Sequence, residues 1–172
     1  MRKNILIFGL ILGAILCINA LVMVNMIYTK PDFKSNDILG YAFMLVVFSL
    51  IFFGIRNYRN KELDGTISFG KALKTGVLIA LVASTLYVIV WLAYYYLFVP
   101  DFIDKYTEHV LHQCTSESEI ATKTKEMKDF KEMYKSTLFV VLITYFEVLP
   151  IGLVVALVSS IILKKKKKTS EK

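Results

Sequence analysis

Four long apolar runs, separated by short segments that hold nearly all of the charges, constrain the fold of this chain more than any other feature. The runs cover about residues 5–28, 38–55, 76–99 and 138–163, and each has at least the roughly 18 residues that a membrane-crossing helix needs. The whole chain is 56% hydrophobic, which exceeds the usual content of a soluble domain. These patterns predict an all-α integral membrane bundle of four transmembrane helices, which forms a single membrane domain over residues 1–172.

The first apolar run has two interpretations. Arg2 and Lys3 precede it, as they would in a secretory signal peptide. The run is longer than the apolar region of a typical cleaved signal, however, and no small residue stands where a lipidated Cys17 would need one. We expect a retained first span, so that the mature protein keeps residues 1–20.

The only sizeable polar segment, residues 100–136, predicts an amphipathic helical pair between the third and fourth spans. Apolar residues recur in it at helical spacing, and Ser116 and Glu119 form a candidate capping box that restarts a helix. The pair is too short for a core of its own, so we expect it to continue from the membrane or to lie on it. The preceding end of the third span is aromatic, which is typical of the headgroup level: Trp91, Tyr94, Tyr95, Tyr96 and Phe98.

The distribution of lysine and arginine predicts the threading. With four spans, the side that holds both termini carries about 13 positive residues and the other side about eight. The termini are therefore expected in the cytoplasm and residues 100–136 outside. The cytoplasmic tail 164–172 would attract anionic lipid headgroups at Lys164 to Lys168. Nucleic acid is the weaker alternative as a partner for this tail, because no aromatic platform accompanies the lysines.

Four segments also resemble a known family: KPDFKSND at 30–37, GIRNYR at 54–59, ISFGKALK at 67–74 and YFEVLP at 145–150. They are similar to the bacterial membrane family called domain of unknown function 4199, and the resemblance covers nearly the whole chain. It implies four helical spans and a place in the bacterial cytoplasmic (inner) membrane. It implies no activity, because that family has no established function or functional residues.

Glu147 is the residue whose position most needs an explanation, because a carboxylate inside the bilayer is costly. Asn19, on the first span, is expected at the same depth of about 14 Å, and Tyr87 lies within a turn of that level. Pro150 has no N–H and frees the carbonyl of Phe146 beside the acid. Two interpretations stay open: a structural hydrogen-bond clamp between Glu147 and Asn19, or a proton or cation site of the transport type.

Small residues recur every four positions in three spans, a pattern that lets membrane helices approach closely. They are Gly9, Gly13 and Cys17; Gly76, Ala80 and Ser84; and Gly152, Ala156 and Ser160. All of them fall in the cytoplasmic half, which predicts a bundle that is tight there and wider outside, like a vestibule. Glu147 and Ala156 point to opposite sides of a straight helix, about 180° apart. Either Pro150 kinks the helix, or one face meets a second copy in a homodimer.

The sequence contains no recognisable catalytic, phosphate-binding or dinucleotide motif, and we expect no cofactor. His109 and His112 are weak candidates for a metal site, because no further pair of ligands follows them. The leading expectation for function is a non-catalytic membrane protein that serves as a partner or accessory subunit of an unknown membrane protein. Two alternatives are a small transporter or proton-coupled permease that uses Glu147, and a membrane enzyme that acts on lipid.

Overall fold

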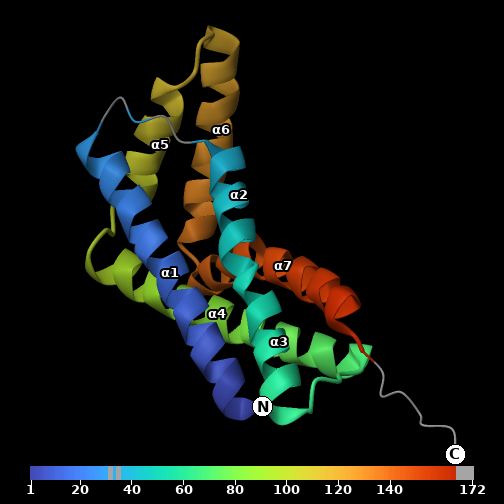
Figure 1. Ribbon diagram of the computed structural model, residues 1–172. Helices are drawn as coiled ribbons and strands as arrows, with labels where there is room; N and C mark the ends of the chain where they lie inside the picture. Colours follow the sequence, from blue (N-terminus) through green and yellow to red (C-terminus); the bar gives the residue numbers. More distant parts are fainter. Residues whose placement is uncertain (31–32, 34–35, 166–172) are drawn as a thin grey trace, which may run out of the picture.

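The structure, a computed structural model, describes residues 1–30, 33 and 36–165, and apart from one isolated bridge its regular secondary structure there is helical (Figure 1). Four stretches are long and apolar enough to cross a membrane, which confirms the predicted all-α bundle with four spans. The helices are α1 (Arg2–Thr29), α2 (Asp37–Phe48), α3 (Leu50–Glu62), α4 (Phe69–Leu97), α5 (Phe102–His112), α6 (Glu117–Tyr134) and α7 (Thr137–Leu163). Helices α2 and α3 together make the second span. Figure 1 shows α5 and α6 side by side at the end of the bundle opposite the N-terminus.

The second span differs from the expected range 38–55 in two respects. Its helix continues to Glu62, because positively charged side chains end the apolar segment but leave the backbone hydrogen bonds of a helix intact. The helix is also interrupted at Ser49, whose hydroxyl donates to the carbonyl of Val46 at 2.6 Å. Ser49 itself keeps helical dihedral angles, so the interruption is local.

Polar side chains start most of the later helices. Asn36 accepts from two backbone N–H groups at the start of α2, and Ser68 and Ser136 each accept one at the starts of α4 and α7. Ser116 accepts from the N–H of Glu119, whose carboxylate in turn accepts from the N–H of Thr115. Residue 35, which could also cap α2, lies outside the described residues. The same holds for the lysines of the tail from residue 166 onward.

Helices α4 and α7 pack against each other through small residues. A Cβ added to Gly76 would lie 2.8 Å from the Cβ of Ala156, and a Cβ added to Gly152 would lie 2.9 Å from the Cβ of Ala80. Both distances are shorter than two carbons tolerate, so the helices approach to a separation that only glycine allows. Ser84 and Ser160, next along the same stripes, are fully buried.

Helix α1 meets α4 in the same way. A Cβ on Gly9 would lie 2.6 Å from the Cβ of Val82, and a Cβ on Gly13 would lie 3.0 Å from the carbonyl oxygen of Ala83. Cys17, at the next position of this stripe, is also buried. The packed half of the bundle is therefore the half that contains the N-terminus.

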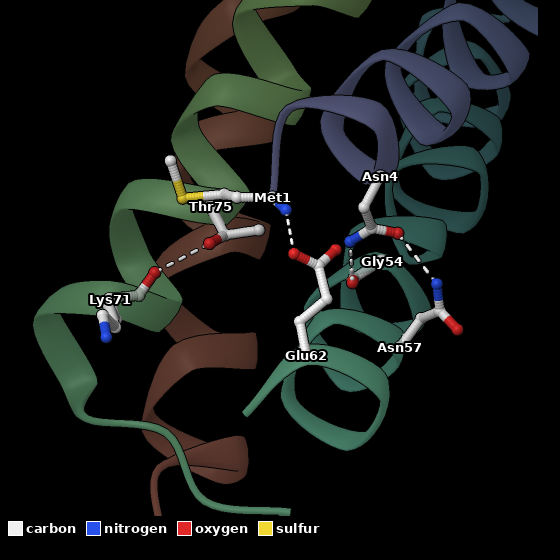
Figure 2. A network of polar contacts seen from close by, with 7 residues as sticks. All are labelled: Met1, Asn4, Gly54, Asn57, Glu62, Lys71 and Thr75. Carbon is white, nitrogen blue, oxygen red and sulfur yellow. Dashed lines mark hydrogen bonds and ion pairs between the residues drawn. The ribbon is translucent and has the colours of Figure 1, made fainter. Parts of the chain in front are cut away.

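A polar network joins α1 to α3 at this end of the bundle (Figure 2). The Asn4 side-chain amide donates to the carbonyl of Gly54 at 2.8 Å and accepts from Asn57 at 2.9 Å. The amino group of Met1 contacts the Glu62 carboxylate. Asn4 is 5% exposed, so these bonds satisfy a polar group that burial would otherwise penalise.

The end of α7 joins the same side of the bundle. Ile67 pairs with Lys165 in an isolated antiparallel bridge, through backbone bonds of 3.0 and 2.8 Å. The Arg59 guanidinium donates to the carbonyl of Leu163 at 3.3 Å. The start of α1 and the end of α7 thus lie at one end of the bundle, and α5 and α6 lie at the other (Figure 1).

Two of the aromatic residues near the end of α4, Trp91 and Tyr95, belong to a second core, whereas Tyr96 and Phe98 are exposed. Trp91 and Tyr95 are only 8% and 9% exposed, because α5 and α6 cover them. Trp91 meets Phe102 edge to face at 5.0 Å, and Tyr95 meets Tyr134 in the same way at 5.4 Å. Phe98, at 72% exposed, keeps the expected outward position.

Candidate functional site

Two adjoining cavities lie in the half of the bundle near α5 and α6. The smaller has a volume of about 320 Å³ and the larger about 430 Å³. They share part of their lining, namely Ala20, Met23, Ile27, Tyr87, Tyr106 and Glu147. We call this combined space the vestibule. Helices α1, α4, α5 and α7 contribute to both cavities, α6 closes the smaller one, and α2 closes the larger one.

Glu147 reaches the vestibule because the packed face of α7 turns gradually around the helix. The buried positions of α7 near Glu147 recur every four residues, from Val140 to Ala156. Each step of four residues rotates the face by about 40°. At the level of Glu147 the neighbouring buried residues are Thr144 and Val148, and the carboxylate lies at the edge of that face.

This rotation accounts for about half of the 180° that separates Glu147 from Ala156 on α7, because the buried face turns by about 80° from Val148 to Ala156. Ala156 packs on α4 two steps of four residues beyond Val148, where the buried face has already turned. Helix α7 is continuous through Pro150, and Pro150 itself is exposed and lines neither cavity. The rest of the angle arises because Glu147 lies beside the buried face and is itself exposed. A second copy of the chain stays a prediction.

The two other polar candidates also line the vestibule. Asn19 lines the larger cavity together with Glu147, as their matched depths lead one to expect. Tyr87 is half-buried and lines both cavities. A direct hydrogen bond between Asn19 and Glu147 stays a prediction.

Aromatic rings form much of the wall of the smaller cavity. They come from three helices and are Tyr87, Trp91, Phe102, Tyr106, Phe130 and Tyr134. The rings of Phe130 and Tyr134 lie 4.8 Å apart, so this part of the wall is closely packed. Burial, with a smaller contribution from nearby Glu147, raises the pKa of Tyr134 to about 12, which keeps its hydroxyl protonated at neutral pH.

The sequence alone did not assign Tyr106, Phe130 and Tyr134 to a site. They belong to the apolar stripe that predicts the amphipathic pair, but a stripe does not say whether it covers lipid or protein. The structure uses it to cover the spans: Tyr134 is 8% exposed, and Phe130 and Tyr106 are partly buried. The end of α6 thereby becomes a wall of the vestibule.

His109 and His112 both line a third cavity, with a volume of about 240 Å³, together with Glu108. His109 is buried and stacks on the Phe33 ring at 5.8 Å, and its Nε2 lies 2.6 Å from the Gln113 side-chain amide. His112 is exposed. Among the described residues, no three His, Cys, Asp or Glu side chains are placed to hold a metal ion. His109 is therefore part of the packing between α5 and the segment before α2.

This burial predicts a pH dependence. Burial, and then repulsion by His112, lowers the pKa of His109 below its ordinary value of 6.5. The unfolded chain then binds more protons than the folded one below pH 6.5, so stability should fall as the pH drops through and below that value. We expect the thermal midpoint to decrease between pH 7.5 and 5.5, and His109→Gln to reduce this decrease. His112→Gln removes only the smaller of the two causes and should therefore reduce this decrease less than His109→Gln does, and equal slopes in all three proteins would contradict the prediction.

Comparison with known proteins gives one match. A family model described as "Protein of unknown function (DUF4199)" matches residues 7–165, which include the last three spans and all but the start of the first. Searches of curated proteins and of solved structures find no match. Because the family model covers nearly the whole chain, the protein belongs to this family of unknown function, DUF4199.

Proposed function

We propose that this is a multi-pass protein of the bacterial cytoplasmic membrane that binds a small molecule in the vestibule around Glu147. In this proposal both termini lie in the cytoplasm, and α5 and α6 lie outside, as the excess of lysine and arginine favours. The observation that carries the proposal is the position of Glu147, an acid at membrane depth that lines both cavities. Ionisable groups inside membrane proteins generally mark the path or site of a substrate or ion.

The vestibule also has the size and chemistry of a ligand site. Each cavity alone is at or above the lower end of the range of about 300–1,000 Å³ that small-molecule sites occupy. Most of its lining is apolar or aromatic, with a few polar groups such as Asn19, Tyr106 and Glu147 that could orient a ligand. The alternative of a lipid-modifying enzyme has less support, because it depends on the histidine pair, and His109 is buried in packing away from both cavities.

At the cytoplasmic end, Lys164 and Lys165 follow the last span directly, and Arg56 and Arg59 lie in the last turns of α3. The bridge between Ile67 and Lys165 holds these segments together. We propose that this end contacts anionic lipid headgroups, an attraction worth about 1 kcal/mol for each lysine or arginine near the surface.

The proposal predicts that water and solutes reach the vestibule from outside. The test starts from a chain in which Cys17 and Cys114 are replaced by serine, and it compares Met23→Cys with Val22→Cys. Met23 lines both cavities, whereas its neighbour Val22 lines neither and is 46% exposed on the outer surface of α1. A thiol reacts as its thiolate, which forms in water and not in lipid. A membrane-impermeant thiol reagent added to intact cells should modify Met23→Cys and leave Val22→Cys unmodified.

Residues 22 and 23 are neighbours in α1, so the two cysteines lie at nearly the same depth in the membrane and differ mainly in the side of the helix that they occupy. Modification of Met23→Cys only after the cells are broken would show that the vestibule opens to the cytoplasm, and the orientation would be wrong. No difference in rate between the two thiols under either condition would mean that no solvent-filled vestibule exists, and the proposed function would fail.

A second candidate function, a membrane partner or accessory subunit, is favoured by one further feature. A groove with a volume of about 410 Å³ lies on the outer surface between the second span and α7, lined by Leu45, Ser49, Phe52, Phe53, Val154, Val155, Val158 and Ser159. The two serines would let another helix approach closely, whether from a second copy or from another protein. If a second copy of the chain occupies the groove, Ser49→Leu should weaken the co-purification of differently tagged copies in mild detergent.

A further inference from the structure

We propose that the groove between the second span and α7 binds one anionic phospholipid. Its acyl chain lies in the groove, its phosphate contacts Arg56 and Lys164, and an ester carbonyl accepts a hydrogen bond from Ser159. This inference rests on the proposed contact between the cytoplasmic end and anionic headgroups, and it does not depend on the vestibule. It assigns a defined site to an attraction that the basic residues alone would leave diffuse.

The groove has the composition and length that suit an acyl chain of one leaflet. Its lining is apolar apart from two serines, and its volume is about 410 Å³. On the second span the lining extends from Leu45 to Phe53, which is about 12 Å along the helix axis. One leaflet contributes about 15 Å of hydrocarbon, half of the core of the bilayer. Phe53, Val154 and Val158 are 50%, 56% and 50% exposed, so a chain can enter the groove sideways from the bilayer.

The cytoplasmic end of the groove carries a positive charge. Arg56 follows Phe52 by four residues and Ser49 by seven, so it lies on the groove face of the helix, one turn beyond the lining. Arg56 is exposed, and no ion pair joins it to an acid among the described residues. Arg59 donates to the carbonyl of Leu163, which holds the end of α7 beside the last turns of α3. Arginine and lysine are the side chains that bind phosphate most often.

The sign of this charge does not depend on the part of the chain outside the described residues. Residues 166–172 contain four lysines and one glutamate, so their net charge is positive. The described residues at this end include two acids, Glu62 and Asp64, and Glu62 contacts the amino group of Met1. The basic side chains outnumber them and are Arg2, Lys3, Arg56, Arg59, Lys61, Lys71, Lys74, Lys164 and Lys165.

The buried hydroxyl of Ser159 indicates a polar group of the ligand at a defined depth. Ser159 is 4% exposed and lines the groove, and no hydrogen bond joins its hydroxyl to another described residue. Its neighbour Ser160, by contrast, donates to the carbonyl of Ala156. Ser159 lies about 7 Å along the axis of α7 from Lys164. The headgroup layer is about 5–7 Å thick on each side of the bilayer, so the ester carbonyls at its inner border lie at the depth of Ser159.

A second copy of the chain suits the groove less well than a phospholipid does. Two copies inserted in the same orientation and packed groove to groove would place their Arg56 side chains opposite each other at the same depth. Like charges in this arrangement repel, whereas a phosphate attracts Arg56. Occupation by a helix of a second copy is therefore an outcome that the test has to separate from lipid binding.

The test uses the full chain purified in dodecylmaltoside. It measures the lipids retained in native mass spectrometry and the lipid concentration that gives half of the maximal rise in thermal midpoint. Dioleoylphosphatidylglycerol should raise the midpoint in a saturable manner, with one lipid retained more tightly than the rest. Dioleoylphosphatidylcholine, which has the same chains and no net charge, should require a concentration about tenfold higher.

Two variants and a control locate the lipid. Arg56→Gln should raise the half-maximal concentration of the anionic lipid about tenfold, because it removes a charged contact with phosphate. Ser159→Ala, which removes one hydroxyl, should raise it about threefold. Lys61→Gln is the matched control, because Lys61 is also exposed in α3 but lies about 140° around the helix from Arg56. It should change the concentration less than about twofold.

The outcomes separate this inference from the proposed headgroup contact. Equal effects of Arg56→Gln and Lys61→Gln would mean that the attraction is diffuse, so that the contact stands and the site fails. Equal stabilisation by the two lipids would overturn both. Val158→Trp fills the groove from a half-exposed position and should abolish the tight retention of one lipid. Unchanged retention in that variant, with loss of co-purification between differently tagged copies, would show that a second copy occupies the groove. Unchanged retention alone would also overturn the inference.

Discussion

Gly76→Leu should prevent α4 and α7 from packing and abolish the folded bundle in detergent. Even a methyl group at this position would lie 2.8 Å from the Cβ and 3.2 Å from the Cα of Ala156, and Ile55 closes the third side at 3.1 Å. Ala156 is fully buried, so the helices would have to separate. Overpacking of this kind costs about 3 kcal/mol or more for a large side chain. Thermal unfolding and size-exclusion chromatography of the purified protein would measure the loss.

Gly70→Leu, in the first turn of the same helix, is the matched control. A Cβ at Gly70 meets no atom within 4 Å, so this variant should fold normally. A finer test exchanges the small residues across the contact. Gly76→Ala alone should destabilise the protein, and Ala156→Gly in the same chain should restore part of the loss, because it removes the methyl group that Gly76→Ala meets. Additive effects of these two changes would show that α4 and α7 do not meet here.

Trp91→Ala should have the second largest effect and should loosen α5 and α6 from the spans. Trp91 is 8% exposed, meets Phe102 of α5 at 5.0 Å, and stacks on Tyr95 at 6.2 Å. Removal of a buried indole leaves a cavity that neighbouring rings fill only in part, at a cost on the order of 3 kcal/mol. We expect a lower thermal midpoint and faster proteolysis in the connection between α5 and α6, at residues 113–116.

Phe98→Ala provides the comparison for this prediction. Phe98 lies in the same aromatic stretch but is 72% exposed, so its removal should change stability little. Equal losses for Trp91→Ala and Phe98→Ala would contradict the aromatic core of the structure.

The structure also changes how the two interpretations of Glu147 compare. A clamp between Glu147 and Asn19 needs only two side chains in contact, whereas the structure places both on the wall of a cavity that eleven further residues line. A clamp does not require that space, and a binding site does. The clamp would leave Glu147→Gln nearly silent, because glutamine still forms hydrogen bonds, while a proton or cation site would lose affinity because glutamine carries no charge.

Several features of this fold follow from the sequence alone. The lipid interior offers no hydrogen-bond partners, so every backbone group of a span must be satisfied within its own helix. Length and apolar composition therefore suffice to predict the four spans that the structure contains. The polar helix starts are equally local: Asn36, Ser68 and Ser116 cap helices because their side chains bond backbone groups only two or three residues away.

Only the tertiary structure decided which faces of these helices meet. A membrane span is apolar on all sides, so its pattern does not distinguish the face that packs on protein from the face that meets lipid. For this reason the sequence did not show that Trp91 is buried beneath α5. It also contained no sign that Asn4 bonds Gly54 and Asn57, which lie 50 and 53 residues away along the chain.

The position of Glu147 depends partly on the sequence alone and partly on the tertiary structure. The sequence determined its depth, because depth depends only on the number of helical residues from the end of the span. The vestibule around it depends on how α7 crosses its neighbours: close contact at Gly152 and Ala156, and separation at the level of Glu147. That crossing is set by side chains of several helices at once, so no single segment of the sequence contains it.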